Sequence, residues 1–291
     1  MTTKTLSSVV GGGGSLIGDV KPMYVDDVDG LAVINGESWL KSGVVETDTA
    51  SYPDAHLGYA HTGDSFSVTS QEATPQGMTW DGTNFWVIGY SSDTAYQYTS
   101  AGVYTGTSFS VSAQETLPRD ITWDGSNFWV IGTATNSVYK YTSAGVYTGT
   151  SFSVTSQESF PQGITWDGTN FWVVGSTSDT VYKYTSAGVY TGTSFSVTSQ
   201  DTIPTDITWD GTHFWVVGSA SDAVYKYTSA GVYTGTNFSV AAQESVPQGI
   251  TWDGSNFWVV GNTGSVYKYA FVLGLGSAQT DYTVPVYVRI K

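Results

Sequence analysis

The chain has 291 residues, a formal net charge of −15, 15% aromatic and 12% charged residues, 34 Gly and no Cys. This excess of acids argues against a nucleic-acid or anionic-lipid partner, because both reward clusters of Lys and Arg. The absence of Cys excludes disulfides and thiolate-bound metals, and no stretch reaches the ~20 apolar residues of a membrane-spanning helix.

We expect no secretion signal in the segment before the first repeat. Met1–Val10 lacks the apolar run of a signal peptide, so we expect that the protein does not leave the cell by the ordinary secretory route. Gly11–Gly14 precedes no strand–helix unit and is expected to be a flexible linker. The stretch from Gly30 to Leu40 has the pattern of a hairpin around Asn35–Gly36.

A unit of 43 residues then repeats five times. The motif Trp-Asp-Gly begins at Trp80, Trp123, Trp166, Trp209 and Trp252. The motif Phe-Ser-Val keeps the same spacing at Phe66, Phe109, Phe152, Phe195 and Phe238. A Tyr-x-Tyr motif begins at Tyr96, Tyr139, Tyr182, Tyr225 and, after a one-residue deletion, Tyr267.

Each unit predicts four short strands and no helix. In one copy they are expected at 163–166, 170–174, 180–184 and 193–197, where aromatic and β-branched residues gather. Asp167-Gly168 between the first two strands is a strong hairpin signal. Four strands in about 40–45 residues is typical of a propeller blade.

The sequence therefore predicts an all-β fold, a five-bladed β-propeller with circular strand closure and small β-rich terminal segments. A Phe-Ser-Val strand at Asp64–Val68 precedes the first Trp-Asp-Gly hairpin, whereas none follows Tyr269. We expect the strand around Phe66 to complete the last blade, because this removes an open sheet edge. Six blades, counting the hairpin at Gly30–Leu40, is the alternative. The two Trp of each unit are expected to pack between blades, with sugar stacking as the alternative.

The repeats differ mainly in two loops, at 71–77 and 90–93 in the first unit, which a meander places at the same end. Loops on a rigid scaffold commonly carry binding residues, so we predict a ligand site there. The alternative is neutral variation in solvated loops, with the acids pairing to backbone N–H groups. The predicted ligand contacts are Glu72, Gln76, Tyr90, Asp93, Glu115, Arg119, Asn136, Glu158, Phe160, Gln162, Asp179, Asp201, Asp222, Glu244 and Gln248.

No catalytic constellation is recognisable, and we predict no enzyme activity, metal or cofactor. The three His (His56, His61 and His213) lack a metal-ligand spacing, and no nucleophile elbow or phosphate loop is present. The loop acids could supply the carboxylate pair of a glycosidase, but their fivefold repetition favours a structural role. The Trp-Asp-Gly hairpin departs in spacing from the Asp-box of sialidases, and Arg119 and Arg289 cannot form an arginine triad. Calcium at the Asp-Gly hairpins is the alternative to ordinary turn chemistry.

Two kinds of resemblance add to this interpretation. The stretch Pro161-Gln-Gly-Ile-Thr-Trp-Asp-Gly168 resembles the opening of bacterial NHL/kelch-like propeller repeats. Five blades with Trp-Asp are also similar to tachylectin-type lectins, whose sugar sites lie between blades, but only the architecture matches. The segments Ser7–Ser15, Trp39–Asp54 and Tyr287–Lys291 resemble parts of bacteriophage tail fibre proteins.

The phage resemblance implies a virion tail protein, made in the host cytoplasm. Residues 1–61 would then attach it to the virion, 62–270 would form the propeller, and 271–291 would form a β segment packing with the N-terminal one. The implied partners are other virion tail proteins, a host surface glycan or receptor, and further copies of the chain, such as a trimer. The alternatives are a structural decoration protein without a ligand, a lectin-like propeller outside phage, and a glycan-cleaving enzyme.

Overall fold

The computed structural model describes residues 31–34, 37–47, 53–278 and 283–289, and side chains from 58 to 272. It divides into two compact units, one formed by Leu57–Val272 and one by Met1–His56 with Leu273–Lys291. Three predictions concern residues outside this description. They are the absence of a signal peptide at Met1–Val10, the flexible linker at Gly11–Gly14 and the resemblance of Ser7–Ser15 to tail fibre proteins.

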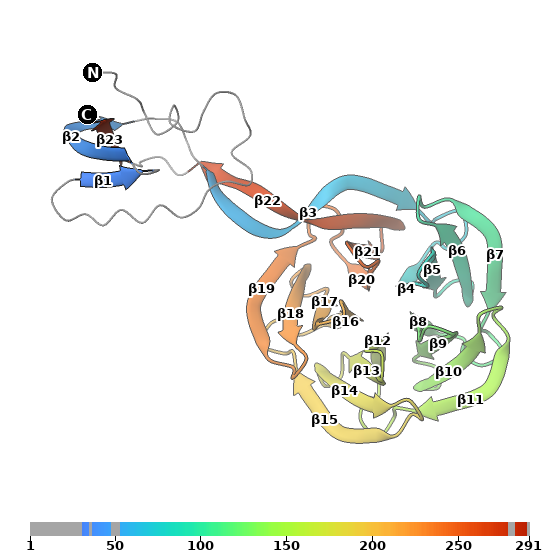
Figure 1. The fold of residues 1–291 in the computed structure, drawn as a ribbon. Helices are drawn as coiled ribbons and strands as arrows, with labels where there is room; N and C mark the ends of the chain where they lie inside the picture. Colours follow the sequence, from blue (N-terminus) through green and yellow to red (C-terminus); the bar gives the residue numbers. More distant parts are fainter. Residues whose placement is uncertain (1–30, 35–36, 48–52, 279–282, 290–291) are drawn as a thin grey trace. The chain divides into compact units, whose positions relative to one another are not determined.

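The larger unit is a propeller of five four-stranded antiparallel sheets, numbered here as blades 1 to 5 (Figure 1). The first strand of each blade lies nearest the common axis and the fourth lies at the rim. Blades 1 and 2 consist of β4 (Pro75–Trp80), β5 (Asn84–Gly89), β6 (Thr94–Thr99) and β7 (Tyr104–Ser110), then β8 (Pro118–Trp123), β9 (Asn127–Gly132), β10 (Ser137–Thr142) and β11 (Tyr147–Ser153). Blades 3 and 4 consist of β12 (Pro161–Trp166), β13 (Asn170–Gly175), β14 (Thr180–Thr185) and β15 (Tyr190–Ser196), then β16 (Pro204–Trp209), β17 (His213–Gly218), β18 (Ala223–Thr228) and β19 (Tyr233–Ser239).

Blade 5 joins the two ends of the repeat array and confirms the predicted circular closure. It consists of β20 (Pro247–Trp252), β21 (Phe257–Gly261), β22 (Ser265–Ala278) and, from the N-terminal side, β3 (Pro53–Ser67). Just beyond β3, the backbone N–H of Val68 donates to the carbonyl of Gly264 at 2.9 Å. This clasp leaves blade 5 with the same four-stranded form as the other blades.

The alternative of six blades is wrong. The predicted N-terminal hairpin forms β1 (Leu31–Ile34) and β2 (Glu37–Thr47), and the residues Asn35–Gly36 between them lie outside the description. These strands belong to a separate three-stranded sheet in which β2 also pairs antiparallel with β23 (Thr283–Arg289). Because β23 comes from the C-terminal segment, this sheet combines strands from before and after the propeller repeats.

Aromatic side chains fill the space between blades, as predicted for the Trp pairs. Trp86 of blade 1 lies with its ring centroid 4.7 Å from that of Phe128 in blade 2, and Trp258 of blade 5 lies 4.8 Å from Phe85 in blade 1. The hairpin carboxylate of Asp81 accepts the indole N–H of Trp86 at 2.7 Å, so this Trp loses no hydrogen bond on burial. Burying one such ring contributes up to ~4–6 kcal/mol.

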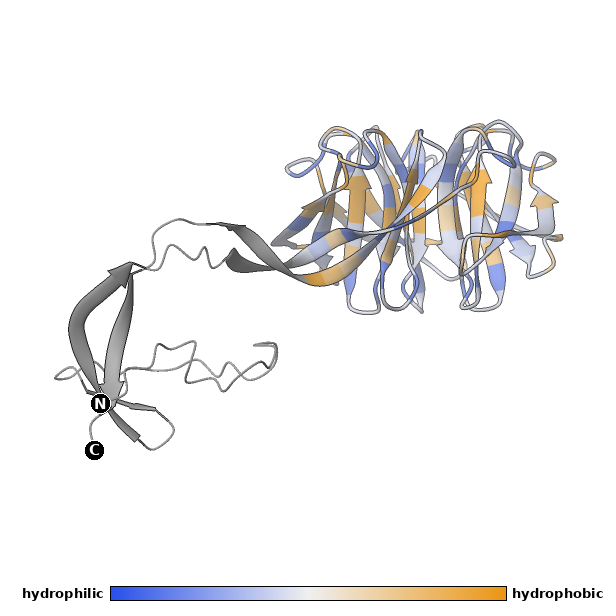
Figure 2. Cartoon of the chain, turned by 90° about the horizontal axis from the view of Figure 1, so that it is seen from above, coloured by the Kyte–Doolittle hydropathy of each residue, from blue (hydrophilic) through white to orange (hydrophobic). Residues whose placement is uncertain are grey.

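Hydrophobic residues concentrate along the strands, whereas the loops at both ends of the blades are mostly hydrophilic (Figure 2). This contrast between strands and loops arises because neighbouring blades cover both faces of each sheet, whereas the loops remain at the surface. Within the described ranges, no helix is long and apolar enough to cross a membrane.

Candidate functional site

The variable loops gather at one end of the propeller, here called the loop face. It comprises residues 71–77 and 90–93 of blade 1 and the equivalent residues of the other blades. Pro75 and Gly89 are partners across the β4–β5 ladder, and the N–H of Tyr90 donates to the carbonyl of Thr74 at 3.1 Å. The two loops of a blade are therefore neighbours, as the meander predicts.

The five loop acids are buried rather than exposed on the loop face. Glu72, Glu115, Glu158, Asp201 and Glu244 are at most 3% exposed. This burial removes them from the set of direct ligand contacts and agrees with the alternative in which they pair with backbone N–H groups.

Glu72 shows how these carboxylates join the two loops. It accepts hydrogen bonds from the N–H of Thr74 at 2.8 Å and from the hydroxyl of Ser92 at 2.5 Å, and from both the N–H and the hydroxyl of Ser91. Burial alone would raise the pKa of this carboxyl, but these hydrogen bonds together lower it. The acid is therefore an internal brace, and Gly89 leaves the room for it, because a Cβ there would collide with the Glu72 side chain.

Four other predicted contacts shape the second loop. Asp93, Asn136, Asp179 and Asp222 occupy the left-handed region of backbone space, with φ between 48° and 51°. Asp and Asn tolerate this conformation better than other non-glycine residues. In the shortened loop of blade 5, Gly264 has φ 68°. These side chains are explained by turn geometry.

Three of the predicted contacts meet above the inner strands and form what we call the aromatic–arginine cluster: Tyr90, Arg119 and Phe160. The Arg119 Cζ lies over the Phe160 ring at 5.1 Å from its centroid and over the Tyr90 ring at 5.7 Å. The rings are 40% and 44% exposed, so they form part of the surface. Blades 1, 2 and 3 each contribute one residue.

Hydrogen bonds hold Arg119 in place at the inner end of the loop. Its Nη1 donates to Oε1 of Gln76 in blade 1 at 2.9 Å, and its Nε donates to Oγ1 of Thr133 at 3.3 Å. Burial lowers the pKa of Arg119, and the nearby Tyr90 and Glu115 oppose this shift. A guanidinium stays protonated at neutral pH, so the cluster carries a fixed positive charge.

The remaining predicted contacts are the amides Gln76, Gln162 and Gln248 on the innermost strands. Gln76 and Gln162 are each 9% exposed, and Gln248 is half-buried. Nε2 of Gln162 donates to the hydroxyl of Ser176 at 3.2 Å. Gln76 supports Arg119, whereas Gln162 is hydrogen-bonded within its own blade.

Sequence reasoning missed a pair of buried carboxyl groups, Asp120 and Asp206, on the innermost strands of blades 2 and 4. Each is 1% exposed. Oδ2 of Asp120 accepts the N–H of Ile164 in blade 3, and Oδ2 of Asp206 accepts the N–H of Ile250 in blade 5, at 2.7 and 2.6 Å. The signal was present in the sequence, because blades 1, 3 and 5 carry Gly at the same position.

The two carboxyl groups affect each other's protonation. Burial raises the pKa of Asp120 to about 7 and raises that of Asp206 well above its ordinary value. A Cβ at Gly77 would collide with Asp120, and one at Gly163 would collide with Asp206. The pair therefore fills space near the axis.

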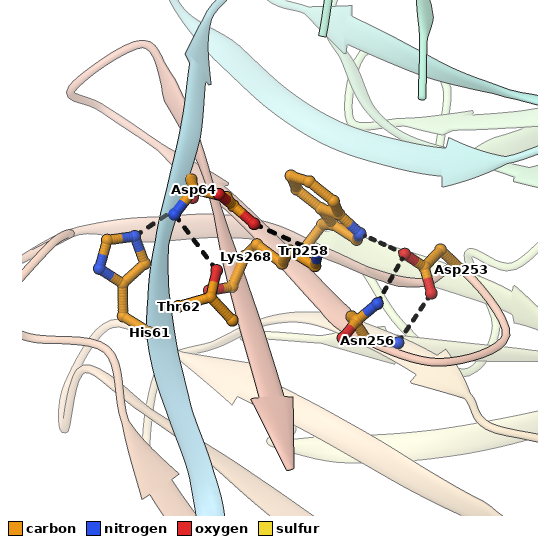
Figure 3. A network of polar contacts seen from close by, with 7 residues as sticks. All are labelled: His61, Thr62, Asp64, Asp253, Asn256, Trp258 and Lys268. Atoms are coloured by element: carbon orange, nitrogen blue, oxygen red, sulfur yellow. Dashed lines mark hydrogen bonds and ion pairs between the residues drawn. The ribbon is translucent and has the colours of Figure 1, made fainter. Parts of the chain in front are cut away.

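A cavity of about 400 Å³ lies where blade 5 closes against blade 1. Figure 3 shows its polar network, in which Nζ of Lys268 pairs with Oδ2 of Asp64 at 3.2 Å beside Trp258. In blades 2 to 4 the equivalent Lys also stacks on its Trp, but a Thr replaces Asp64. Among these blades, the ion pair is thus specific to the seam. In the described part of the chain, no three acidic or His side chains are placed to hold a metal.

Solved structures share the propeller architecture. A glutaminyl cyclase from Myxococcus xanthus aligns with a TM-score of 0.57 at 11% identity, over 74% of this chain and 98% of that protein. Virginiamycin B lyase from Staphylococcus aureus aligns with a TM-score of 0.45 at 19% identity, over 68% of this chain and 66% of that protein. At such identities the likeness concerns the fold alone, and a propeller fold does not settle whether the chain is an enzyme. The chain matches no protein-family model and no curated protein sequence.

Proposed function

We propose that this protein is a non-enzymatic recognition protein of a virion tail, whose loop face binds a glycan on the host surface. The observation that carries the proposal is the aromatic–arginine cluster. Two large rings are held open to solvent around a fixed cation at the end of the propeller where the repeats differ. Aromatic and Arg side chains dominate the energetics of recognition surfaces.

A glycan fits the chemistry of this surface. The faces of Tyr90 and Phe160 offer planar apolar surfaces for a sugar ring, and the polar loop residues around them offer hydrogen bonds to hydroxyl groups. The net charge of −15 favours a ligand other than nucleic acid. The placement in a virion tail rests on the resemblance of the terminal segments to phage tail proteins.

The test is binding of the full-length chain to immobilised glycans from host cells. The repeats provide matched substitutions: Tyr90→Ser and Phe160→Val install residues that other blades carry at these positions, Ser176 and Val246. We expect both substitutions to weaken binding about tenfold or more, because stacked aromatic contacts are lost.

The control is Val103→Thr in the turn between β6 and β7, at the opposite end of blade 1, where Val103 is exposed. It should bind like the unchanged protein. Equal loss in all three variants, or no binding to any glycan, would contradict the proposal and favour a structural decoration protein. Neighbouring tail genes, and the protein in purified virions, would test the virion assignment separately.

A further inference from the structure

The aromatic–arginine cluster is dispensable for folding, because the propeller itself provides four comparisons. At the position of Arg119, blades 1, 3 and 5 carry Gln and blade 4 carries Thr, and at the positions of Tyr90 and Phe160 the other blades carry smaller polar or aliphatic residues. All five blades nevertheless have the same four strands. The coincidence of one cation and two rings in a single place therefore needs an explanation other than blade structure.

The guanidinium of Arg119 still has donors to offer. Of its five N–H groups, the Nε–H and one on Nη1 are used within the protein. Across the residues whose side chains are described, none accepts a hydrogen bond from Nη2. The two internal bonds fix the plane of the group, which lowers the entropic cost of a further bidentate contact.

Arg119 is also the sole basic residue of the loop face. The loops of the five blades otherwise contain acids, amides, hydroxyls and apolar side chains. The Lys of blades 2 to 5 lie on the third strands, where they stack on Trp rings. An anionic group approaching this end of the propeller therefore has one favourable place to bind.

We propose that Arg119 binds the carboxylate of an acidic sugar, while Tyr90 and Phe160 pack against the sugar ring. This inference rests on the proposed function and specifies its ligand class. The planar fork of a guanidinium matches the two coplanar oxygens of a carboxylate in a bidentate contact, and sulfated probes test the competing oxyanion. The partly buried position strengthens the contact relative to one in open solvent.

The net charge of the protein affects the rate of binding but leaves the site unchanged. At low salt, the charge of −15 repels an anionic ligand over distances comparable to the Debye length. Moderate salt screens this repulsion and leaves the short contact with Arg119 largely intact. The association rate should therefore increase as the salt concentration rises from about 10 to about 150 mM. A basic lectin surface would show the reverse behaviour.

The experiment measures affinity of the full-length chain for four sets of immobilised oligosaccharides, which carry uronic acids, sialic acids, sulfate groups or no charge. Each uronic-acid probe is paired with the same oligosaccharide after reduction of its carboxyl groups to alcohols. The variants are Arg119→Gln, which recreates the residue of blades 1, 3 and 5, and Arg119→Lys, which keeps the charge but not the fork. Thermal unfolding confirms that both variants fold.

We expect binding to carboxylated probes to fall roughly 10- to 100-fold on carboxyl reduction and in Arg119→Gln. Arg119→Lys should retain an intermediate affinity. Equal binding of neutral and acidic probes, unchanged in Arg119→Gln, would overturn this inference and leave glycan recognition standing. A preference for sulfated probes would overturn the carboxylate assignment, and no binding to any probe would refute both proposals.

Discussion

Replacing both members of the buried carboxyl pair, Asp120→Asn with Asp206→Asn, should change how stability depends on pH. In the native protein the pKa of Asp120 is raised to about 7 from an ordinary value of 3.8. An acid with a raised folded-state pKa holds its proton more tightly in the folded than in the unfolded chain. Its contribution to stability is fully present below pH ~4 and is lost as the pH rises towards 7.

The size of this loss follows from the pKa change. At 1.36 kcal/mol per tenfold change in proton affinity, a rise from 3.8 to about 7 corresponds to ~4 kcal/mol. Asp206 shifts in the same direction, so its contribution is also lost as the pH rises above ~4, up to its own folded-state pKa. For a protein whose total stability is of the order of 5–15 kcal/mol, this is a large fraction.

The assay is urea unfolding at several pH values from 4 to 8, for the native protein and the double variant, with the difference between them as the result. Taking the difference removes the contributions of other groups, such as Glu72, whose lowered pKa acts in the opposite direction. The native protein should lose several kcal/mol more than the variant across this range. Parallel pH profiles would refute the raised pKa values of the pair.

Three further predictions concern stability. Glu158→Ala should lower the free energy of unfolding by about 2–4 kcal/mol, because the N–H of Phe160 and the hydroxyl of Ser178 lose their acceptor; urea unfolding measures this, and a change below ~0.5 kcal/mol would contradict the brace. Gly77→Ala should destabilise the protein even when combined with Asp120→Gly, because the added Cβ would also collide with backbone atoms of residues 119 and 120, and an unchanged free energy of unfolding in the double variant would contradict this close packing. Asp64→Thr should cost ~1 kcal/mol or less by thermal unfolding, because the Asp64 side chain is 63% exposed, so a larger loss would mean that the seam depends on this ion pair.

Most of the fold could be predicted because its cause is local and repeated. The Trp-Asp-Gly hairpin determines the first two strands of each blade. The strand around Phe66 precedes the first hairpin and has no counterpart after the last one, which indicates the circular closure. The packing of Trp between blades follows from the need to cover both faces of every sheet. Each of these features is determined by short stretches of sequence and by their spacing.

The candidate site could be predicted only in part, because sequence places a residue in a loop without giving its direction. Glu72 and its equivalents belong to the variable loops, yet they turn inward to brace them. The contact of Arg119 with Tyr90 and Phe160 joins residues of three blades, so it depends on the curvature of the closed ring. The sequence shows that one position of the repeat carries Gly in blades 1, 3 and 5 and Asp in blades 2 and 4. The structural reason for this pattern becomes clear only once these positions are known to meet near the axis.

The most direct test of the account is binding by a variant that combines Tyr90→Ser, Arg119→Gln and Phe160→Val, so that every residue of the aromatic–arginine cluster becomes one found in another blade. We predict that this protein unfolds at nearly the same temperature as the native chain but loses binding to host-surface glycans, whereas Val103→Thr retains it. Undiminished glycan binding by the folded triple variant would contradict the central claim that this cluster is the recognition site.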